Sequence, residues 1–500
     1  MKRLMAGISL TALVLAAALT ARGDTPDNES AKTWDENATA ESLGLEPHKL
    51  QDGFFPLFPW GGFDDGDTII GSMSECGFNM PGFISAGALP AAKIYSMKAI
   101  IRFPAPLYTE GENTEAYGEK VKEAVAPTKD DPDVIGYYLI DEPGADKFPA
   151  LAVTVAAIKK HAPGKLAYIN LFPGYASTLG ADAVSQLGTW TYTEYLERYV
   201  QEVRPQFISY DNYMVEYSDD MTSAERAASY WHDMLEVRRI AMKYKLPWWN
   251  TVSSLSLRPK SSPPTPARLA FQAYTSLAAG CNALSWYLYS LAAGYTYKPL
   301  NEAGDRTLTW LYLQAVNRQI QTVGSFLTQF ESADVWFSDP APVPGLPQNP
   351  GTLVADLTLS WSKMAEPNEI TDTPQVMVGE FRSKEDSRRA VMIVNLNFRR
   401  SLKADFQALD GYHITGAFNP VANKINERPE TGWWILPGHG TLFLLESDPF
   451  PLEISERQDY NFSRQRVAQL ALNYNGLICP PVLPAQACTS LAASERPGKL

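Results

Sequence analysis

The stretch Val134-Ile-Gly-Tyr-Tyr-Leu-Ile-Asp141-Glu142-Pro143-Gly144 is an apolar run that stops at two carboxylates and a Pro-Gly turn. A helix-like segment, residues 148–161, and a second apolar run, residues 165–172, follow it. A strand, a helix and a second strand in this order predict a βαβ unit with parallel strands.

The same alternation extends in both directions, from about residue 51 to residue 289. Eight stretches have the composition of buried strands, and amphipathic segments such as residues 223–244 separate most of them. Eight strands with intervening helices predict a closed (β/α)₈ barrel. The first strand is not followed by a GxGxxG turn, which argues against a dinucleotide-binding fold. The eight expected strands are 53–60, 78–83, 98–103, 134–141, 165–172, 206–213, 246–252 and 283–289.

The pattern changes after a last barrel helix that ends near residue 330. Residues 340–350 are rich in proline, and short alternating runs at 376–381, 390–395 and 440–445 predict a small antiparallel β-sandwich. We therefore expect a signal peptide (1–22), a flexible segment (23–45), the barrel (46–332), a Pro-rich linker (333–351), the sandwich (352–447) and a poorly ordered tail (448–500).

The N-terminal residues are typical of an export signal. Lys2 and Arg3 precede a short apolar run, residues 8–19, and small residues follow it. Arg22 stands where a lipobox would carry cysteine, so no lipid anchor is expected. No later segment has the length of a transmembrane helix. These features predict an exported protein, periplasmic or extracellular.

Charge and residue spacing limit the classes of molecule that this protein is expected to bind. The net charge is −13 and the pI is near 5.0, which disfavours nucleic acid and fits a neutral substrate such as a carbohydrate. No CxxC or HExxH spacing is present, so neither a metal nor another cofactor is expected. We expect Cys76 and Cys281 to be buried thiols and Cys479 and Cys488 to form one local disulfide.

Glu142 is the leading candidate for catalysis. Side chains at the C-terminal ends of barrel strands face the substrate, and Glu142 follows the fourth strand. A carboxyl partly shielded by aromatic groups has a raised pKa and donates a proton at neutral pH. By composition alone, the run Asp141-Glu142-Pro143-Gly144 is better explained as a plain polar turn, but its place after the fourth of eight strands favours catalysis.

The run Asp141-Glu142-Pro143 resembles the Asn/Asp-Glu-Pro motif of clan A glycoside hydrolases, in which the Glu is the general acid/base. Together with 168–173 and 207–213, it also looks like secreted barrel proteins of polysaccharide-degrading bacteria. Residues 300–307 are similar to the loop before the last barrel helix of family 42-like β-galactosidases, and 378–381 and 391–395 to their C-terminal domain. The resemblance covers roughly residues 50 to 446 and implies a glycosidase.

The sequence departs from that clan at the seventh strand, whose residues 246–254 contain no carboxylate where the clan has its nucleophilic Glu. Asp211, at the end of the sixth strand, is the best substitute as nucleophile, base or charge stabiliser; a sugar-binding role is an equal alternative. A third possibility is the pair Asp141 and Glu142, which resembles that of substrate-assisted hexosaminidases. Strand alternation sends neighbours to opposite sides, so that mechanism needs the turn to redirect one of them.

Sugar-binding candidates come from other strand ends, because aromatic faces pack against the C–H faces of sugars and amides bind hydroxyls. Glu302 lies in a loop that fits a turn and is not favoured as an acid. A barrel that binds glycans without cleaving them remains an alternative to the glycosidase, and no GxSxG supports an esterase. The binding candidates are Trp60, Asn170, Tyr210, Tyr213, Trp249, Trp286 and Tyr287.

Overall fold

The computed structural model describes residues 34–60, 67–180, 184–218, 221, 227–257, 263–289, 294–348, 350–361 and 373–447. The expected signal peptide (1–22), the tail from residue 448 and the cysteine pair Cys479 and Cys488 lie outside the described residues. No helix of the described part is both long and apolar enough to cross a membrane.

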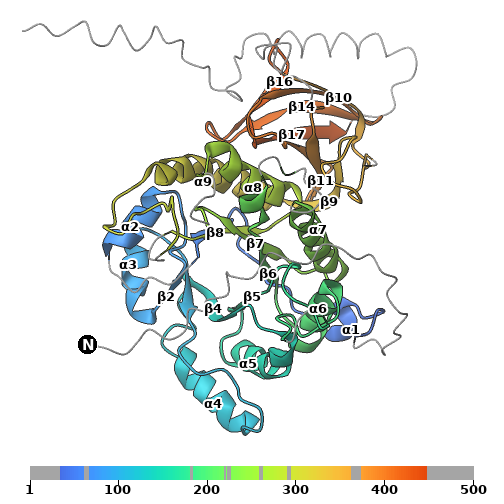
Figure 1. The fold of residues 1–500 in the computed structure, drawn as a ribbon. Coiled ribbons are helices and arrows are strands. Elements are labelled where there is room, and N and C mark those ends of the chain that lie inside the picture. Colours follow the sequence, from blue (N-terminus) through green and yellow to red (C-terminus); the bar gives the residue numbers. More distant parts are fainter. Residues whose placement is uncertain are drawn as a thin grey trace, which may run out of the picture.

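The first part of the chain is the predicted (β/α)₈ barrel, with parallel strands surrounded by helices (Figure 1). Its strands pair in the orders β1-β8-β7-β6 and β2-β3-β4-β5. The strands are β1 (Leu57–Pro59), β2 (Phe83–Ile84), β3 (Ala99–Arg102), β4 (Val134–Asp141), β5 (Leu166–Asn170), β6 (Ile208–Asp211), β7 (Trp248–Ser253) and β8 (Ala283–Tyr287).

Backbone contacts join these two groups of strands into a ring. A parallel bridge pairs Leu171 with Tyr210, next to β5 and β6. On the other side, the Asn79 amide donates to the Leu57 carbonyl over 3.0 Å, and the Asn79 side chain accepts from the Leu57 amide over 2.8 Å. The barrel is therefore closed, which leaves no free edge.

A helix follows each barrel strand, and polar caps fix several helix starts. The side chains of Asn113, Thr191 and Thr265 accept backbone hydrogen bonds at the starts of α4, α6 and α8. The helices are α2 (Asp67–Glu75), α3 (Leu89–Ile94), α4 (Thr114–Val125), α5 (Phe148–His161), α6 (Tyr192–Arg198), α7 (Ala228–Lys243), α8 (Pro266–Ala278) and α9 (Leu308–Leu327).

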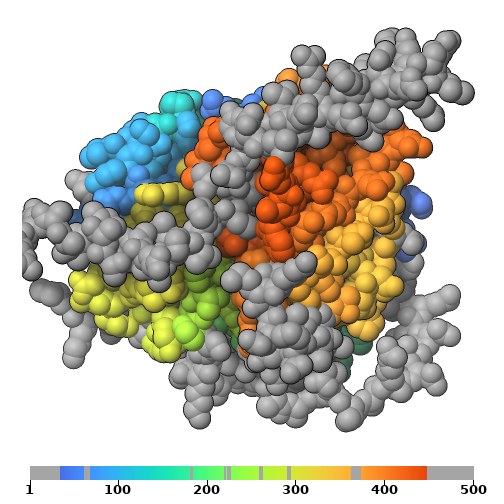
Figure 2. Space-filling model, turned by 90° about the horizontal axis from the view of Figure 1, so that it is seen from above, coloured from blue at the N-terminus to red at the C-terminus, as the bar shows by residue number. Residues whose placement is uncertain are grey.

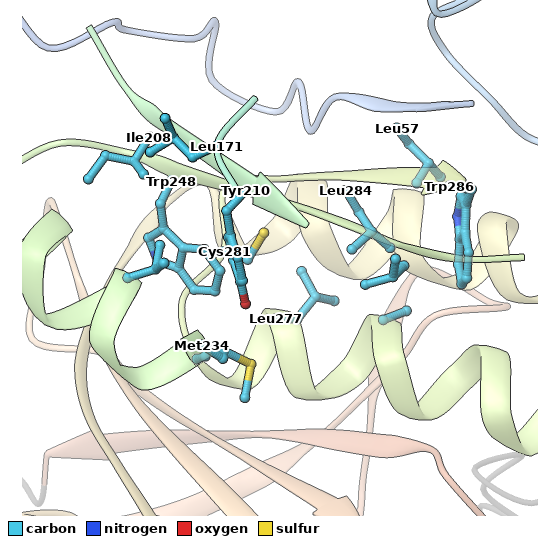
Figure 3. Close-up of a cluster of buried hydrophobic side chains, with 14 of the residues drawn as sticks. Leu57, Leu171, Ile208, Tyr210, Met234, Trp248, Leu277, Cys281, Leu284 and Trp286 are labelled. Atoms are coloured by element: carbon cyan, nitrogen blue, oxygen red, sulfur yellow. The ribbon is translucent and has the colours of Figure 1, made fainter. Parts of the chain in front are cut away.

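The barrel strands have two buried faces. One face fills the barrel interior with large rings, among them Phe58, Tyr168 and Trp249. The other packs beneath the helices, and Figure 3 shows Leu57, Leu284 and other members of this outer layer. Both faces are apolar, so the register of the alternation decides which side chains reach the open end.

The C-terminal domain consists of two antiparallel sheets around an apolar core. The larger sheet has the order β15-β14-β17-β12-β11-β9, and the smaller has the order β10-β13-β16. The strands are β9 (Phe330–Phe337), β10 (Val354–Trp361), β11 (Val376–Ser383), β12 (Arg389–Asn395), β13 (Leu402–Ala408), β14 (Tyr412–Asn419), β15 (Lys424–Asn426), β16 (Trp433–Ile435) and β17 (Gly440–Ser447).

Two expected segment boundaries differ from the structure. The chain passes from α9 almost directly into β9, which pairs with β11, so the first residues of the expected linker form a strand. The proline-rich residues 340–348 and 350 instead lie between two strands of the same domain. Within the N-terminal segment expected to be flexible, α1 (Ala40–Leu43) is capped by Thr39. A local cap and a long-range strand pairing explain these differences.

Helix α8 joins the two domains, because it packs both on β7 and on the sheet containing β11, β12 and β17. Gly379 and Gly438 approach backbone carbonyls of α8 so closely that neither position has room for a side chain. In Figure 2 the orange surface of the C-terminal domain borders the green and yellow surface of the barrel. The helix is consequently buried nearly all round.

Cys76 and Cys281 are buried free thiols, as predicted.

Candidate active site

Strand β4 directs Asp141 toward the mouth, by which we mean the end of the barrel where the strands' C-termini lie. The register between β4 and β5 shifts after Tyr138, so that Ile140 pairs with Ile169 and Asp141 with Asn170. This bulge adds one residue to β4 and reverses its alternation. Asp141 therefore shares the inner face with Asn170, whose side-chain amide donates to Asp141 Oδ1 over 3.2 Å.

Glu142 reaches the same space through an unusual backbone conformation. Its φ is +46°, in the left-handed region that non-glycine residues rarely adopt. Such strain persists only where the surroundings impose it, and it is concentrated at functional sites. The bulge and this turn together bring two neighbouring carboxylates into one mouth, which simple strand alternation would have prevented.

The turn that carries Glu142 is held from three sides. The Glu142 amide donates to the Asn170 carbonyl over 2.9 Å, and the Tyr195 hydroxyl donates to the Pro143 carbonyl over 2.6 Å. The Ala145 amide donates to the Leu187 carbonyl over 2.9 Å. A Cβ at Gly144 would lie 2.6 Å from an Asp146 carboxylate oxygen and 2.8 Å from a backbone carbonyl, so glycine is required there.

Asp211 enters the mouth from the end of β6. It is only 4% exposed, and the Tyr213 hydroxyl donates to its Oδ2 over 2.8 Å. Its Oδ1 has no hydrogen-bond partner of good geometry among the described groups, although the Asn170 amide lies near enough to Asp211 to lower its pKa. A buried carboxylate oxygen without a donor is costly in a purely structural role, which favours a group that faces a ligand.

A chain of hydrogen bonds orients Asn170 between the acids. The Ser209 hydroxyl donates to Asn170 Oδ1 over 2.9 Å, and Ser209 is 2.8 Å from the Tyr168 hydroxyl. Because the Ser209 proton is already used, Tyr168 donates to Ser209. This order turns the amide NH₂ of Asn170 toward Asp141. Asn170 is fully buried, so the network fixes its orientation.

All three carboxyls bind protons more tightly than usual. Burial raises the pKa of Glu142 to about 8, and the charge of Asp141 adds to the rise. The surrounding protein also raises the pKa of Asp141 to about 6, against a hydrogen bond from Asn170, although this residue is exposed at the mouth. For Asp211, burial first and then the charges of Glu142 and Asp141 raise the pKa well above its usual value. The three groups therefore act on one another, and near neutral pH Glu142 retains its proton.

Aromatic walls flank this cluster. The rings of Tyr213 and Tyr287 are 5.2 Å apart, both are partly exposed, and Tyr295 continues the row beside Tyr287. Trp60 faces the barrel interior and packs edge-on against Tyr138. Tyr213 and Tyr287 thus offer a surface for a ligand, whereas Trp60, which is 7% exposed, forms part of the floor.

Three of the expected binding residues do not reach the mouth. Tyr210 and Trp286 lie on the outer face of their strands, beneath the helices, where Figure 3 shows Tyr210 beside Trp248 and Met234. Their neighbours Asp211 and Tyr287 occupy the inner face, so alternation excludes both from it. Trp249 points inward but is 2% exposed and packs on Phe207 and Tyr168 deep in the barrel. We remove these three from the candidates.

The structure adds residues that the sequence did not single out. Tyr138 lies on β4, three residues before Asp141, and its ring stacks on that of Phe83 with 4.2 Å between the centroids. Burial raises the pKa of Tyr138, and the charges of Asp141 and Glu142 add to this. Glu216, in the short helix η4 (Met214–Tyr217), hydrogen-bonds Ser253 at the end of β7, and burial raises its pKa to about 7. The charge that acts on Glu216 is that of Arg268, whereas the charges that act on Asp211 are those of Glu142 and Asp141. Asp211 therefore remains the partner of Glu142. Period-2 alternation within β4 was the only sequence signal for Tyr138.

Among the described residues, no group of three or more His, Cys, Asp or Glu side chains is arranged to hold a metal ion. The three acids of the mouth are instead surrounded by tyrosine hydroxyls and amides. Such a set is suited to proton transfer and to hydrogen bonds with hydroxyl groups.

The raised pKa of Glu142 has a measurable effect on stability. Below pH 4 both the folded and the unfolded protein are protonated at this residue. As pH rises from about 4.5 to about 8, the unfolded chain releases the proton first, and the wild-type fold loses stability. We expect Glu142→Gln to raise the thermal unfolding midpoint above that of the wild type at pH 8, with little difference at pH 4.

The control for this prediction is Glu302→Gln. The pKa of Glu302 is lowered by its hydrogen bond with Lys298, so its removal should give no gain at pH 8. Midpoints measured at pH 4, 6 and 8 for the three proteins decide the matter. A Glu142→Gln variant less stable than the wild type at pH 8 would contradict the raised pKa of Glu142.

No family model matches the chain, and no curated protein matches it in sequence. Its structure is similar to a β-galactosidase from the psychrophilic Marinomonas ef1, with 9% identity and a TM-score of 0.39, over 54% of this chain and 60% of that one. The match thus spans less than two thirds of that β-galactosidase. It is also similar to an endo-β-1,4-mannanase from Thermotoga petrophila (11% identity, TM-score 0.39, 71% and 97% covered) and to Amy13B of Eubacterium rectale (10% identity, TM-score 0.43, 81% and 98% covered).

Proposed function

We propose that this chain is an exported glycoside hydrolase that cleaves O-glycosidic bonds of an oligo- or polysaccharide. The observation that carries the proposal is the cluster of Asp141, Glu142 and Asp211 at the mouth of the barrel, with Glu142 protonated near neutral pH. The expected signal peptide, residues 1–22, supports a periplasmic or extracellular location. The net charge of −13 is compatible with a neutral glycan.

Glu142 serves as the general acid in this mechanism. Its proton passes to the glycosidic oxygen as the bond between that oxygen and the anomeric carbon breaks, and the sugar develops oxocarbenium character. A carboxyl with a pKa near 8 is still protonated at neutral pH and can donate. Asn170, hydrogen-bonded to Asp141, and the fixed Pro143-Gly144 turn keep the acid in place.

Asp211 serves as the second carboxylate. In its ionised form it attacks the anomeric carbon or takes a proton from the attacking water, and in either role it stabilises the positive charge of the transition state. Burial and the charges of Glu142 and Asp141 raise the pKa of Asp211, whereas the Tyr213 hydroxyl, which donates to Oδ2, favours the ionised form. When Glu142 holds its proton, its charge no longer opposes ionisation of Asp211. Oδ1 has no hydrogen-bond partner of good geometry among the described groups and is the oxygen available to the sugar.

A second candidate function uses the two adjacent acids. The left-handed φ of Glu142 and the bulge in β4 allow Asp141 and Glu142 to face the same mouth, which a substrate-assisted hexosaminidase requires. In that mechanism Asp141 orients the 2-acetamido group of the substrate, whose carbonyl oxygen attacks the anomeric carbon while Glu142 protonates the leaving oxygen. This alternative predicts that cleavage needs an N-acetylated sugar.

Release of 4-nitrophenol from a panel of 4-nitrophenyl glycosides, together with reducing-end release from neutral polysaccharides, tests the proposal. The panel includes glucosides, galactosides, mannosides and N-acetylglucosaminides in both anomeric forms. We expect turnover of at least one neutral sugar by the wild type, and in Glu142→Gln a much larger loss on polysaccharides than on the 4-nitrophenyl glycosides. Cleavage confined to N-acetylated sugars and lost in Asp141→Asn favours the second candidate.

Calorimetric titration with the matching oligosaccharides completes this experiment. Binding without any product after long incubation overturns hydrolysis and favours a barrel that only binds glycans. Absence of both binding and cleavage across the panel overturns the carbohydrate assignment.

A further inference from the structure

Tyr175 is a residue of the mouth that lies on none of the strands. It follows Pro173 and Gly174 in the loop after β5 and is 38% exposed, so part of its ring faces solvent. Burial raises the pKa of the Tyr175 phenol well above the usual value, the charge of Asp211 adds to this, and a hydrogen bond with the Tyr213 backbone opposes it. The charge of Glu142 also acts on the phenol. Tyr175 therefore lies close enough to Asp211 and Glu142 to feel their charges, and part of its side chain is exposed.

A buried carboxylate in the helix layer of the barrel holds the loop that carries Tyr175. Asp233, on α7, is 6% exposed, and its Oδ2 accepts a hydrogen bond from the Gly174 amide over 3.0 Å. The same oxygen accepts from the side-chain amide of Asn212 over 2.8 Å. Gly174 lies directly against the Asp233 carboxylate, and a side chain at this position has no room.

The two donors on Asp233 belong to the two segments that build the site. Gly174 is adjacent to Tyr175, and Asn212 lies between Asp211 and Tyr213. Asn212 Oδ1 in turn accepts from the Met214 amide over 2.9 Å, which fixes the chain after β6. One carboxylate oxygen thus ties the loop after β5 to the end of β6. Burial raises the pKa of Asp233 to about 7, and the hydrogen bonds from Gly174 and Asn212 oppose this rise, so the two donors favour the ionised form, which is the stronger acceptor.

We propose that Tyr175 is a further substrate-contacting residue of the candidate active site, and that Asp233 is the positioning residue that holds it over Asp211. The inference rests on the proposed function, because the contact made by Tyr175 is with the sugar bound at the three acids. Its ring supplies an aromatic face and its hydroxyl a hydrogen bond to that sugar. Asp233 touches no substrate and acts through Gly174 and Asn212.

The test combines hydrogen exchange, which needs no substrate, with turnover. In Asp233→Ala the Gly174 amide and the Asn212 side chain lose their acceptor, and we expect about tenfold faster exchange in peptides covering residues 172–180. Asp233→Asn retains an oxygen at the same place and should restore most of the protection. The same order, with Asp233→Asn nearest the wild type, is expected for kcat/KM.

Glu197→Ala is the matched control. Glu197 is also a buried carboxylate on an outer helix, α6, but it accepts from Lys243 and Tyr244 and from no residue of the mouth. Its loss should lower stability without a selective change in residues 172–180. If this control loosens that loop as much as Asp233→Ala does, or if Asp233→Ala leaves its exchange unchanged, the positioning role is wrong.

Tyr175→Phe and Tyr312→Phe test the contact itself. Loss of one hydrogen bond to the sugar should lower kcat/KM about tenfold in Tyr175→Phe. Tyr312, on α9, should tolerate the change. Unchanged kcat/KM in both Tyr175→Phe and Tyr175→Ala overturns the contact. If the wild type cleaves no glycan but the loop loosens in Asp233→Ala, the proposed function fails and the tether stands.

Discussion

Glu142→Gln should lose about 10²- to 10⁴-fold in turnover of a glycoside with a poor leaving group, because the proton for the leaving oxygen is gone. The loss should be much smaller for a 2,4-dinitrophenyl glycoside, whose leaving group departs without protonation. Glutamine has nearly the same shape, and the turn is held through backbone groups of residue 142 and its neighbours, so the fold should persist. Steady-state rates on the two substrates measure the difference.

Two comparisons make this prediction specific. Glu302→Gln removes an exposed loop glutamate that pairs with Lys298 and should leave both rates unchanged. Circular dichroism and the thermal midpoint of Glu142→Gln verify that it is folded. Equal losses on both leaving groups would contradict the role of Glu142 as the acid, since an acid matters only where the leaving oxygen needs a proton.

Asp211→Asn should lose activity by a similar factor, about 10²- to 10⁴-fold, but on both substrates alike. Its expected role is at the anomeric carbon, which every substrate shares, and not at the leaving group. The amide oxygen of asparagine still accepts from the Tyr213 hydroxyl, so the local structure should be retained. Rates on the same two glycosides provide the measurement.

Asp146→Asn is the control for Asp211→Asn, because Asp146 is an exposed carboxylate next to the same turn. We expect Asp146→Asn to leave the rates on both substrates unchanged. Wild-type rates in a folded Asp211→Asn protein would remove Asp211 from the mechanism and would leave Asp141 as the partner of Glu142. The two variants Glu142→Gln and Asp211→Asn thus separate protonation of the leaving group from chemistry at the sugar.

The carboxyls of the candidate site also lower the stability of the fold. Glu142 and Asp211 have raised pKa values because each is buried near other acids. Above the ordinary pKa of a carboxyl, each lowers the stability of the fold. A cluster that destabilises the protein and has an oxygen without a donor is more readily explained by function than by folding.

The sequence was sufficient for the architecture. Apolar runs and amphipathic segments alternate eight times, and this local pattern has one compact solution, the closed barrel that the structure confirms. The same pattern placed Glu142, Asn170 and Asp211 at strand ends, and the structure brings all three to the mouth. The prediction that Tyr210 binds sugar was wrong, because alternation places it on the outer face next to the inward-facing Asp211.

The tertiary structure decided which neighbouring side chains share the mouth. An extra residue in β4, visible only through its pairing with β5, turns Asp141 inward, and the left-handed turn at Glu142 adds the second acid. The link from Asp233 to Gly174 joins residues 59 positions apart and has no local signature. Strand and helix patterns depend on near neighbours in the chain, so the sequence specified the barrel; register, turn conformation and distant contacts depend on packing, so only the folded chain assembled its site.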